Sequence, residues 1–220
     1  MKIVSINGSP RGKLSNTNLM VSAFMKGAKD SGAEIENIYL SEKNIEYCKG
    51  CHSCWFENPG VCVIEDDMVE VLSLLGGVSV IVLASPIFFN NISGTLKVFM
   101  DRLTVIGNPY QPKKDEEKNQ DLTQTSNTTP KLVMISNCGL PDRSQFEVVS
   151  LWIKKVAKMM QSELIGEIYA IQGKLLANPP KELEIEINNY MKLLEKAGKE
   201  ISTNMKLSEE TEKRIAQNFM

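Results

Sequence analysis

Short apolar runs alternate with amphipathic stretches along most of the chain. Five segments predict strands, at 2–6, 34–40, 78–85, 131–136 and 164–171, and those at 2–6 and 131–136 read as buried. The run at 78–85 is apolar on both faces, which is typical of a central strand in a parallel sheet that helices cover. Between the runs, apolar residues recur at the spacing of helices. This alternation predicts an α/β fold: a doubly wound, five-stranded parallel sheet with helices on both faces.

Capping residues and glycines predict where these helices begin and end. Ser15 or Asn16 begins the first helix, which Gly32 ends, and Asp66 or Asp67 begins the second. The second helix is expected to bury Val69, Leu72 and Leu75. A third helix is expected over 93–103, and a fourth is defined by Phe146, Val149, Trp152 or Ile153, and Val156.

The last helix has a heptad-like stripe of Leu183, Ile187, Tyr190, Leu194, Ala197 and Ile201. This stripe predicts the last covering helix of the sheet, or a helix that also reaches an oligomer partner. The chain is expected to be one domain, 1–220, with three additions: a cysteine-rich loop at 44–65, a mobile insertion at 107–130 and a helical extension at 181–220. The insertion has too few apolar residues to pack.

Composition excludes several classes of function. The chain has 25 Lys and Arg against 27 Asp and Glu, a net charge of −2, which argues against a general nucleic-acid binder. The longest strongly apolar stretch, Val78–Ala84, is far shorter than the ~20 residues of a membrane span. The N-terminus does not resemble a signal peptide, so we expect a cytoplasmic protein with reduced thiols.

His52 is the single histidine of the 220 residues. Histidine-based catalytic triads and zinc sites therefore have too few ligands here. The chemistry either uses few side-chain acids and bases or is carried by a cofactor.

Three loops follow strands at the edge where such sheets bind ligands: 7–17, 85–93 and 136–144. The first loop precedes a helix, whose unpaired amides suit a phosphate. It adds the hydroxyls of Ser9, Ser15 and Thr17 and the guanidinium of Arg11. It matches neither the Walker A nor the dinucleotide motif. The alternative is a polar, capped loop without a ligand.

Three motifs, in chain order, carry a resemblance to a known family. They are Gly8-Ser9-Pro10-Arg11 with Ser15-Asn16-Thr17; Ser85-Pro86-Ile87-Phe88-Phe89 followed by Leu96-Lys97 and Asp101-Arg102; and Asn137-Cys138-Gly139. Together they resemble the flavodoxin-like, NAD(P)H-dependent FMN reductases.

The resemblance implies an FMN site in which the flavin carries the hydride and no side chain is catalytic. The phosphate would be held by Ser9, Arg11, Ser15, Asn16 and Thr17. The flavin ring would lie between Pro86, Ile87, Phe88, Phe89 and Asn90 on one side and Asn137, Cys138 and Gly139 on the other. Phe88 replaces a tyrosine common in this family. Lys97 and Asp101 are expected to form a surface ion pair, with Arg102 as a helix-end charge outside the site.

A phosphatase of low molecular weight is a weaker alternative. Such enzymes use Cys-x5-Arg, whereas Cys138 and Arg143 have four residues between them and follow a late strand. A thiolate nucleophile also needs loop amides arranged around one phosphate.

Four of the five cysteines are clustered: Cys48, Cys51, Cys54 and Cys62. The tight triple resembles the compact motif of iron–sulfur flavoproteins, which implies a [4Fe–4S] cluster. Free or redox-active thiols, as a lid or an oligomer contact, are a second interpretation, and zinc is a third. His52 is expected to be a loop residue rather than a ligand.

These features predict an FMN-dependent oxidoreductase that takes hydride from NAD(P)H and passes electrons to a small acceptor such as a quinone, a free flavin or an iron chelate. The alternative is an electron-transfer module that serves a protein partner such as ferredoxin. A redox sensor without turnover is a third hypothesis. We expect a homodimer or homotetramer, because relatives close the flavin site with a neighbouring subunit.

Overall fold

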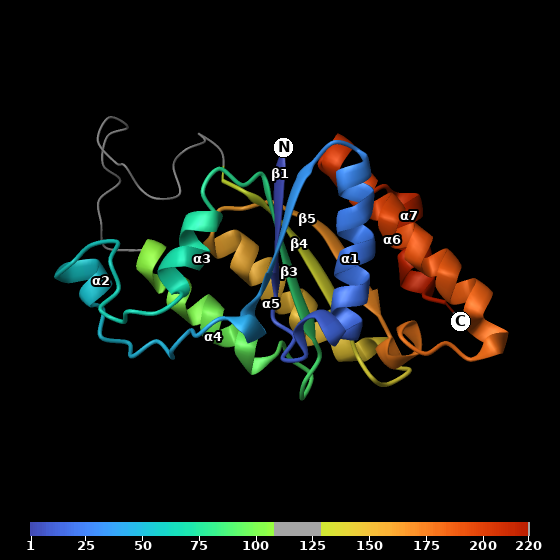
Figure 1. Cartoon of the computed structure of the whole chain (residues 1–220), viewed down its shortest axis with the longest axis horizontal. Coiled ribbons are helices and arrows are strands. Elements are labelled where there is room, and N and C mark those ends of the chain that lie inside the picture. Colours follow the sequence, from blue (N-terminus) through green and yellow to red (C-terminus); the bar gives the residue numbers. More distant parts are fainter. Residues whose placement is uncertain (108–128, 220) are drawn as a thin grey trace.

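A five-stranded, all-parallel sheet forms the centre of the protein (Figure 1). The structure is a computed structural model that describes residues 1–107 and 129–219. The strand order is β2-β1-β3-β4-β5, which is the flavodoxin-like order. The predicted fold class is confirmed, and each expected strand lies within two residues of the observed one. The strands are β1 (Lys2–Asn7), β2 (Glu34–Tyr39), β3 (Val80–Pro86), β4 (Lys131–Asn137) and β5 (Leu164–Ala170).

Helices cover both faces of the sheet and enclose two hydrophobic cores (Figure 1). One face carries α1 (Asn16–Asp30), α6 (Glu184–Asn204) and α7 (Glu209–Gln217). The other carries α3 (Met68–Leu74), α4 (Gly94–Arg102) and α5 (Glu147–Met159). The short α2 (Ser53–Phe56) lies away from the sheet, within the cysteine-rich loop. In the part of the chain described, no helix is both long and apolar enough to cross a bilayer.

Helices α1 and α6 pack unusually closely through two glycines. A Cβ atom on Gly27 would lie 1.8 Å from the carbonyl oxygen of Glu195, and one on Gly198 would lie 1.8 Å from that of Phe24. The contact buries five stripe residues of α6, namely Ile187, Tyr190, Leu194, Ala197 and Ile201. The stripe therefore packs within the chain, as the covering-helix interpretation predicts, but α7 rather than α6 is the last helix on this face.

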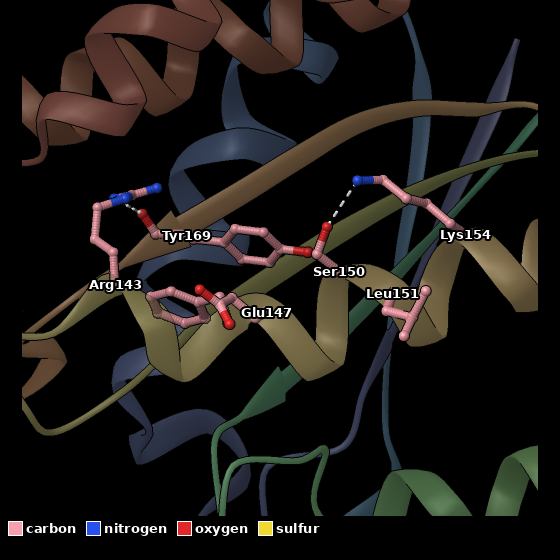
Figure 2. Close-up of a pocket in the computed structure, with 7 residues that line it drawn as sticks. Arg143, Glu147, Ser150, Leu151, Lys154 and Tyr169 are labelled. Atoms are coloured by element: carbon pink, nitrogen blue, oxygen red, sulfur yellow. Dashed lines mark hydrogen bonds between the residues drawn. The ribbon is translucent and has the colours of Figure 1, made fainter.

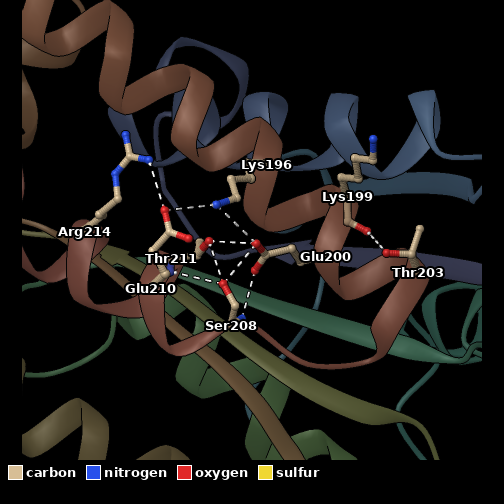
Figure 3. A network of polar contacts seen from close by, with 8 residues as sticks. All are labelled: Lys196, Lys199, Glu200, Thr203, Ser208, Glu210, Thr211 and Arg214. Atoms are coloured by element: carbon tan, nitrogen blue, oxygen red, sulfur yellow. Dashed lines mark hydrogen bonds and ion pairs between the residues drawn. The ribbon is translucent and has the colours of Figure 1, made fainter.

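The C-terminal extension consists of two helices joined by a polar network (Figure 3). Met205 adopts a left-handed conformation and ends α6. Ser208 then caps α7 by accepting a hydrogen bond from the amide of Thr211. Glu200 of α6 accepts hydrogen bonds from the Ser208 amide and from the Thr211 hydroxyl, at 2.9 and 2.8 Å. Glu200 thus fixes the angle between the two helices.

The structure departs from one expectation about local structure and does not describe the segment of another. The expected buried face of α3 is only partly right: Leu72 and Leu75 pack half-buried against the core, but Val69 is 65% exposed, and the fully buried residues are Met68 and Val71. A seven-residue helix with apolar residues at neighbouring positions does not determine its own phase. The expected insertion at 107–130 falls almost wholly on residues 108–128, outside the described residues.

Candidate functional site at the carboxyl edge of the sheet

Buried serines join the loops at the carboxyl ends of three neighbouring strands. The hydroxyl of Ser93 donates to the carbonyl of Gly8 at 2.6 Å, and the amide of Ser93 donates to the hydroxyl of Ser85 at 2.8 Å. The hydroxyl of Ser136 donates to the carbonyl of Ser85 at 2.7 Å. Ser85, Ser93 and Ser136 are all at most 1% exposed. These bonds fix the three predicted ligand loops relative to one another.

The first loop places free amides at the start of α1. Ser15 caps the helix, as predicted, by accepting from the amide of Asn18 at 3.0 Å. Its hydroxyl also donates to the carbonyl of Gly12, which has a φ of +49°. Within the described residues, the amides of Asn16 and Thr17 have no hydrogen-bond acceptor. Because these N–H groups lie at the positive end of the helix dipole, they suit an anion.

The remaining groups of this loop also fit a phosphate. Ser9 and Thr17 are 2% and 1% exposed. Arg11 lies at the exposed rim, where its Nη2 donates to the carbonyl of Leu14 at 2.7 Å. Beneath the loop, the Oδ1 of Asn7 accepts from the amide of Ser9, and the buried Nδ2 of Asn7 has no partner in the described residues. The loop therefore offers donors and one cation to a monophosphate.

The second loop presents two aromatic rings at the same edge. The amide of Phe88 donates to the carbonyl of Asn91 at 2.9 Å, and the reverse bond is 3.0 Å. The turn between them holds Phe89 and Asn90 at φ of +48° and +59°, a conformation that is uncommon for a large side chain. Phe88 is half exposed and Phe89 is fully exposed. Both aromatic rings would therefore lie next to a flat ligand bound at this edge.

The third loop contacts both of the others. The amide of Ile87 donates to the carbonyl of Asn137 at 2.8 Å, and the Nδ2 of Asn137 donates to the hydroxyl of Thr17 at 2.7 Å. Cys138 is 3% exposed, and burial raises the pKa of its thiol. Space is open beside Gly139. The structure thus brings the three predicted flavin loops to one edge.

The phosphatase alternative finds no support in this geometry. The Cys138 thiol donates to the carbonyl of Leu140 at 3.2 Å. Arg143 instead donates to the carbonyl of Tyr169 at 3.4 Å and lies over the ring of Phe146. Figure 2 shows Arg143 and Tyr169 among the side chains that line a shallow cavity of about 380 Å³. Its lining mixes both charges and contains none of the predicted site residues; it comprises Arg143, Phe146, Glu147, Ser150, Leu151, Lys154 and Tyr169.

The four clustered cysteines lie on the loop between β2 and α3, which we call the cysteine loop (44–65). Cys48 and Cys51 are exposed, whereas Cys54 and Cys62 are partly buried, and all four are free thiols. Burial raises the pKa of Cys54, and the neighbouring thiols of Cys62, Cys51 and Cys48 raise it further. Within 1–107 and 129–219, no three His, Cys, Asp or Glu side chains are grouped so that they could hold a metal. The four thiols therefore lie near one another on one loop but do not form a ready site for a single metal ion.

Two further groups of the cysteine loop are well defined. Hydrogen bonding from the Ser53 amide lowers the pKa of the Cys51 thiol, while the Ser53 hydroxyl donates to the carboxylate of Glu57 at 2.9 Å. His52 adopts a left-handed conformation before α2, and its ring stacks on Trp55 at 4.5 Å between centroids. This placement agrees with the expectation that His52 is a loop residue.

Arg102 differs from its expected role. Lys97 and Asp101 form the predicted exposed ion pair, but Arg102 is only 2% exposed, so its interpretation as a surface helix-end charge is wrong. Arg102 forms a buried ion pair with Asp66. The signal was its position three residues after Phe99, on the buried face of α4. Sequence reasoning also missed the serine bonds between the loops, because they depend on tertiary structure.

Comparison with known proteins places this geometry in a family. The model for NADPH-dependent FMN reductases matches residues 1–121. An iron-sulfur flavoprotein of Archaeoglobus fulgidus is 40% identical over 107 residues, which is 49% of this chain and 47% of that protein. One of Methanocaldococcus jannaschii is 38% identical over 102 residues, 46% of this chain and 51% of that protein. The chain thus matches about half the length of these curated relatives.

Solved structures agree on the fold. An FMN-dependent NADH-azoreductase from Bacillus anthracis, in complex with FMN, superposes with a TM-score of 0.62 at 16% identity and covers 92% of this chain and 100% of that one. An NAD(P)H:quinone oxidoreductase from Methanothermobacter marburgensis gives 0.63 at 14% identity, over 93% of this chain and 98% of that one. With more than half of its residues matched by the family model, this chain belongs to the NADPH-dependent FMN reductases.

Proposed function

We propose that the chain binds one FMN at the carboxyl edge of the sheet and uses it to oxidise NAD(P)H. The observation that carries this proposal is the first loop, where the amides of Asn16 and Thr17, at the start of α1, have no acceptor among residues 1–107 and 129–219. Ser9 and Arg11 complete the donor set around a phosphate. Ser15 acts mainly by shaping the loop, because its hydroxyl already donates to the carbonyl of Gly12.

The second and third loops would enclose the flavin ring. Pro86, Ile87, Phe88, Phe89 and Asn90 would line one side, and Asn137, Cys138 and Gly139 the other. Bound flavin supplies the two-electron chemistry, since it accepts a hydride and passes electrons on. The chain's own part is to orient the reactants and to supply main-chain hydrogen bonds. Because the flavin would carry the chemistry, the chain needs few side-chain acids and bases, which agrees with its single histidine.

The proposed acceptor is a small molecule such as a quinone, a flavin or an iron chelate. Phe88 and Phe89 are exposed at the rim, where an aromatic acceptor could stack on or beside them after the nicotinamide leaves. The test is anaerobic reduction of the FMN-loaded chain by NADH or NADPH, followed by mixing with each acceptor. Lack of FMN binding, or FMN that neither nucleotide reduces, would reject the proposal.

A second candidate function is an iron–sulfur flavoprotein that passes electrons to a protein partner such as ferredoxin. It is supported by four neighbouring thiols on one loop and by relatives that are named iron-sulfur flavoproteins. The ligands would be Cys48, Cys51, Cys54 and Cys62, whose four thiolates match the ligand set of a [4Fe–4S] cluster. A visible spectrum with iron and sulfide analysis of anaerobically purified protein separates this candidate from free thiols and from zinc.

Assembly and location complete the proposal. We propose a homodimer or homotetramer in which a neighbouring subunit closes the flavin edge, because exposed apolar residues such as Phe89, Phe56 and Val61 lie on the flavin and cysteine loops. Light scattering at micromolar concentration tests this assembly. We propose a cytoplasmic location, because the five free cysteines suit a reducing compartment.

A further inference from the structure

The cysteine loop is closed at its base by hydrogen bonds between its two ends. The amide of Asn44 donates to the Asp67 carboxylate at 2.7 Å, and the amide of Asp67 donates to the carbonyl of Asn44 at 3.0 Å. One step further in, the amide of Glu46 donates to the carboxylate of Asp66 at 2.8 Å. The loop therefore leaves and re-enters the fold at nearly the same place.

Arg102 of α4 occupies the centre of this base. Its guanidinium holds the Asp66 carboxylate through both Nη atoms, and the two side chains are 1% and 0% exposed. Nη1 also donates to the carbonyl of Glu46 at 2.9 Å, and Nη2 lies 3.6 Å from the Sγ of Cys62 as a donor. A single side chain thus touches the loop near its start, near its end and at one of the four sulfurs.

The tip of the loop is fastened to the same segment. The indole Nε1 of Trp55 donates to the carbonyl of Thr104 at 2.8 Å, in the short helix η3 (Leu103–Ile106) that follows α4. At its other end, α4 begins after Ser93, whose hydroxyl and amide bind the first and second flavin loops. Helix α4 therefore connects the flavin edge to the cysteine loop.

A buried ion pair is a poor source of net stability, because desolvation of the two charges offsets their attraction. Net stability therefore does not account for a buried ion pair at this position, and the contact with Cys62 suggests a different role. A cationic N–H donor beside a sulfur ligand stabilises negative charge on the group that the sulfur binds, and so favours its reduced form.

We propose that Arg102 is a positioning residue for the group held by the four cysteines. Together with Asp66 it holds the cysteine loop closed, and it directs a cationic donor to the sulfur of Cys62. This inference rests on the iron–sulfur candidate function above. The proposal leaves the flavin site unchanged, because the hydrogen bonds of Arg102 in the described structure all go to Glu46, Asp66 and Cys62 and none to the three flavin loops.

The test uses the full chain in a Trp152→Phe background, so that Trp55 is its one tryptophan. Arg102→Lys keeps the charge but loses the planar fork. The double variant Arg102→Met/Asp66→Leu removes both charges together, which leaves no uncompensated buried ion to unfold the protein. Lys97→Met is the matched control, because it removes an exposed ion pair from the same helix. Each protein is loaded with FMN and reconstituted anaerobically with iron and sulfide.

The double variant should bind FMN and be reduced by NAD(P)H like the parent. Its Trp55 should become more accessible to acrylamide, its iron content should fall severalfold, and the midpoint potential of the remaining iron should become more negative. The midpoint potential of Arg102→Lys should lie between that of the parent and that of the double variant. Iron content, potential and quenching that equal those of the Lys97→Met control would overturn the proposal.

The outcomes also separate this proposal from the functions on which it rests. If the reconstituted parent contains no iron, the iron–sulfur assignment fails and the role of Arg102 toward a bound group fails with it. Acrylamide quenching of Trp55 then still decides whether Arg102 closes the loop. If the parent does not bind FMN, the oxidoreductase proposal fails. The iron and quenching measurements do not depend on FMN, so they still test the role of Arg102.

Discussion

The side-chain amide of Asn137 donates a 2.7 Å hydrogen bond to the hydroxyl of Thr17. This bond links the end of β4 to the first turn of α1, across 120 residues of sequence. Both side chains are almost fully buried. The first and third of the three loops at this edge, which we propose bind the phosphate and the flavin ring, are consequently held together before any ligand binds.

Replacing Thr17 by Val should destabilise the FMN-free protein by about 1–3 kcal/mol, because the buried amide of Asn137 then loses its acceptor. Urea unfolding at pH 7 measures the loss. The matched control is Thr95→Val, which changes the same residue type at the second position of α4. Equal midpoints for the two variants would show that the bond contributes nothing.

Removing the guanidinium of Arg11 should weaken FMN binding by about 1.5–3 kcal/mol, the range for a hydrogen bond to a charged group. Quenching of flavin fluorescence in a titration of Arg11→Ala gives the affinity. Lys13→Ala serves as the control, because Lys13 is paired with Glu42 at the surface. Unchanged affinity, or FAD as the native cofactor, would contradict the assignment of this loop.

If the four cysteines bind a cluster, Cys51→Ser should lose iron and keep FMN, because the phosphate loop is a separate segment. Reduction of the flavin by NAD(P)H should persist, while one-electron transfer to a protein acceptor should collapse. Cys138→Ser is the control for iron content, since Cys138 lies on the third flavin loop. Iron that stays at the parent level in Cys51→Ser would remove this residue from the ligand set.

A methyl group on Gly198 cannot be accommodated without separating α1 from α6, because the nearest atom is the backbone carbonyl of Phe24. Gly198→Ala should therefore cost about 3 kcal/mol, the upper part of the range for overpacking. Thermal unfolding shows this as a lower Tm. Gly94→Ala should leave the Tm near that of the parent, since nothing lies within 4 Å of its added methyl.

The network around Glu200 should make stability depend on pH. Partial burial opposes ionisation of Glu200, but hydrogen bonds from the Ser208 amide and from the Thr211 and Ser208 hydroxyls outweigh it and lower the pKa of this carboxyl. A group with a lowered pKa stabilises the fold above its ordinary pKa, and this contribution is lost as the pH falls through the folded value.

Glu200→Gln should therefore be less stable than the parent at pH 7, by about 1 kcal/mol. The difference should shrink below about pH 5, where carboxyl groups take up protons. Chemical unfolding at several pH values measures it, with Glu34→Gln on the exposed end of β2 as the control. A difference that stays constant from pH 7 to pH 3 would show that ionisation of Glu200 is not involved.

Much of the fold could be predicted from local patterns. Strands β3 and β4 are nearly continuous apolar runs, β2 alternates apolar with polar residues, and the caps at Ser15 and Ser93 are polar residues directly before helices. The phase of α3 could not be predicted, because seven residues with adjacent apolar positions fit two faces equally. The close approach of α1 and α6 was also hidden, since a glycine in a helix does not indicate what touches it.

The candidate site divides in the same way. Its loops could be placed at one edge because parallel strands share a carboxyl end. The contacts within it, such as Ser93 with Gly8, join residues 85 positions apart and have no local signal. The prediction for Arg102 was wrong because of a misleading local signal. Lys97 and Asp101 form a surface ion pair on the same helix, and Arg102 was assigned to the same surface.

The closed base of the cysteine loop makes it a self-contained cassette. Its ends meet at Asn44 and Asp67, and it departs from β2, an edge strand that pairs with β1 on one side. Evolution could lengthen, exchange or delete such a cassette without altering the ladder of the sheet. An engineer who transplants it onto another flavodoxin-like chain should carry Arg102 and Asp66 with the four cysteines.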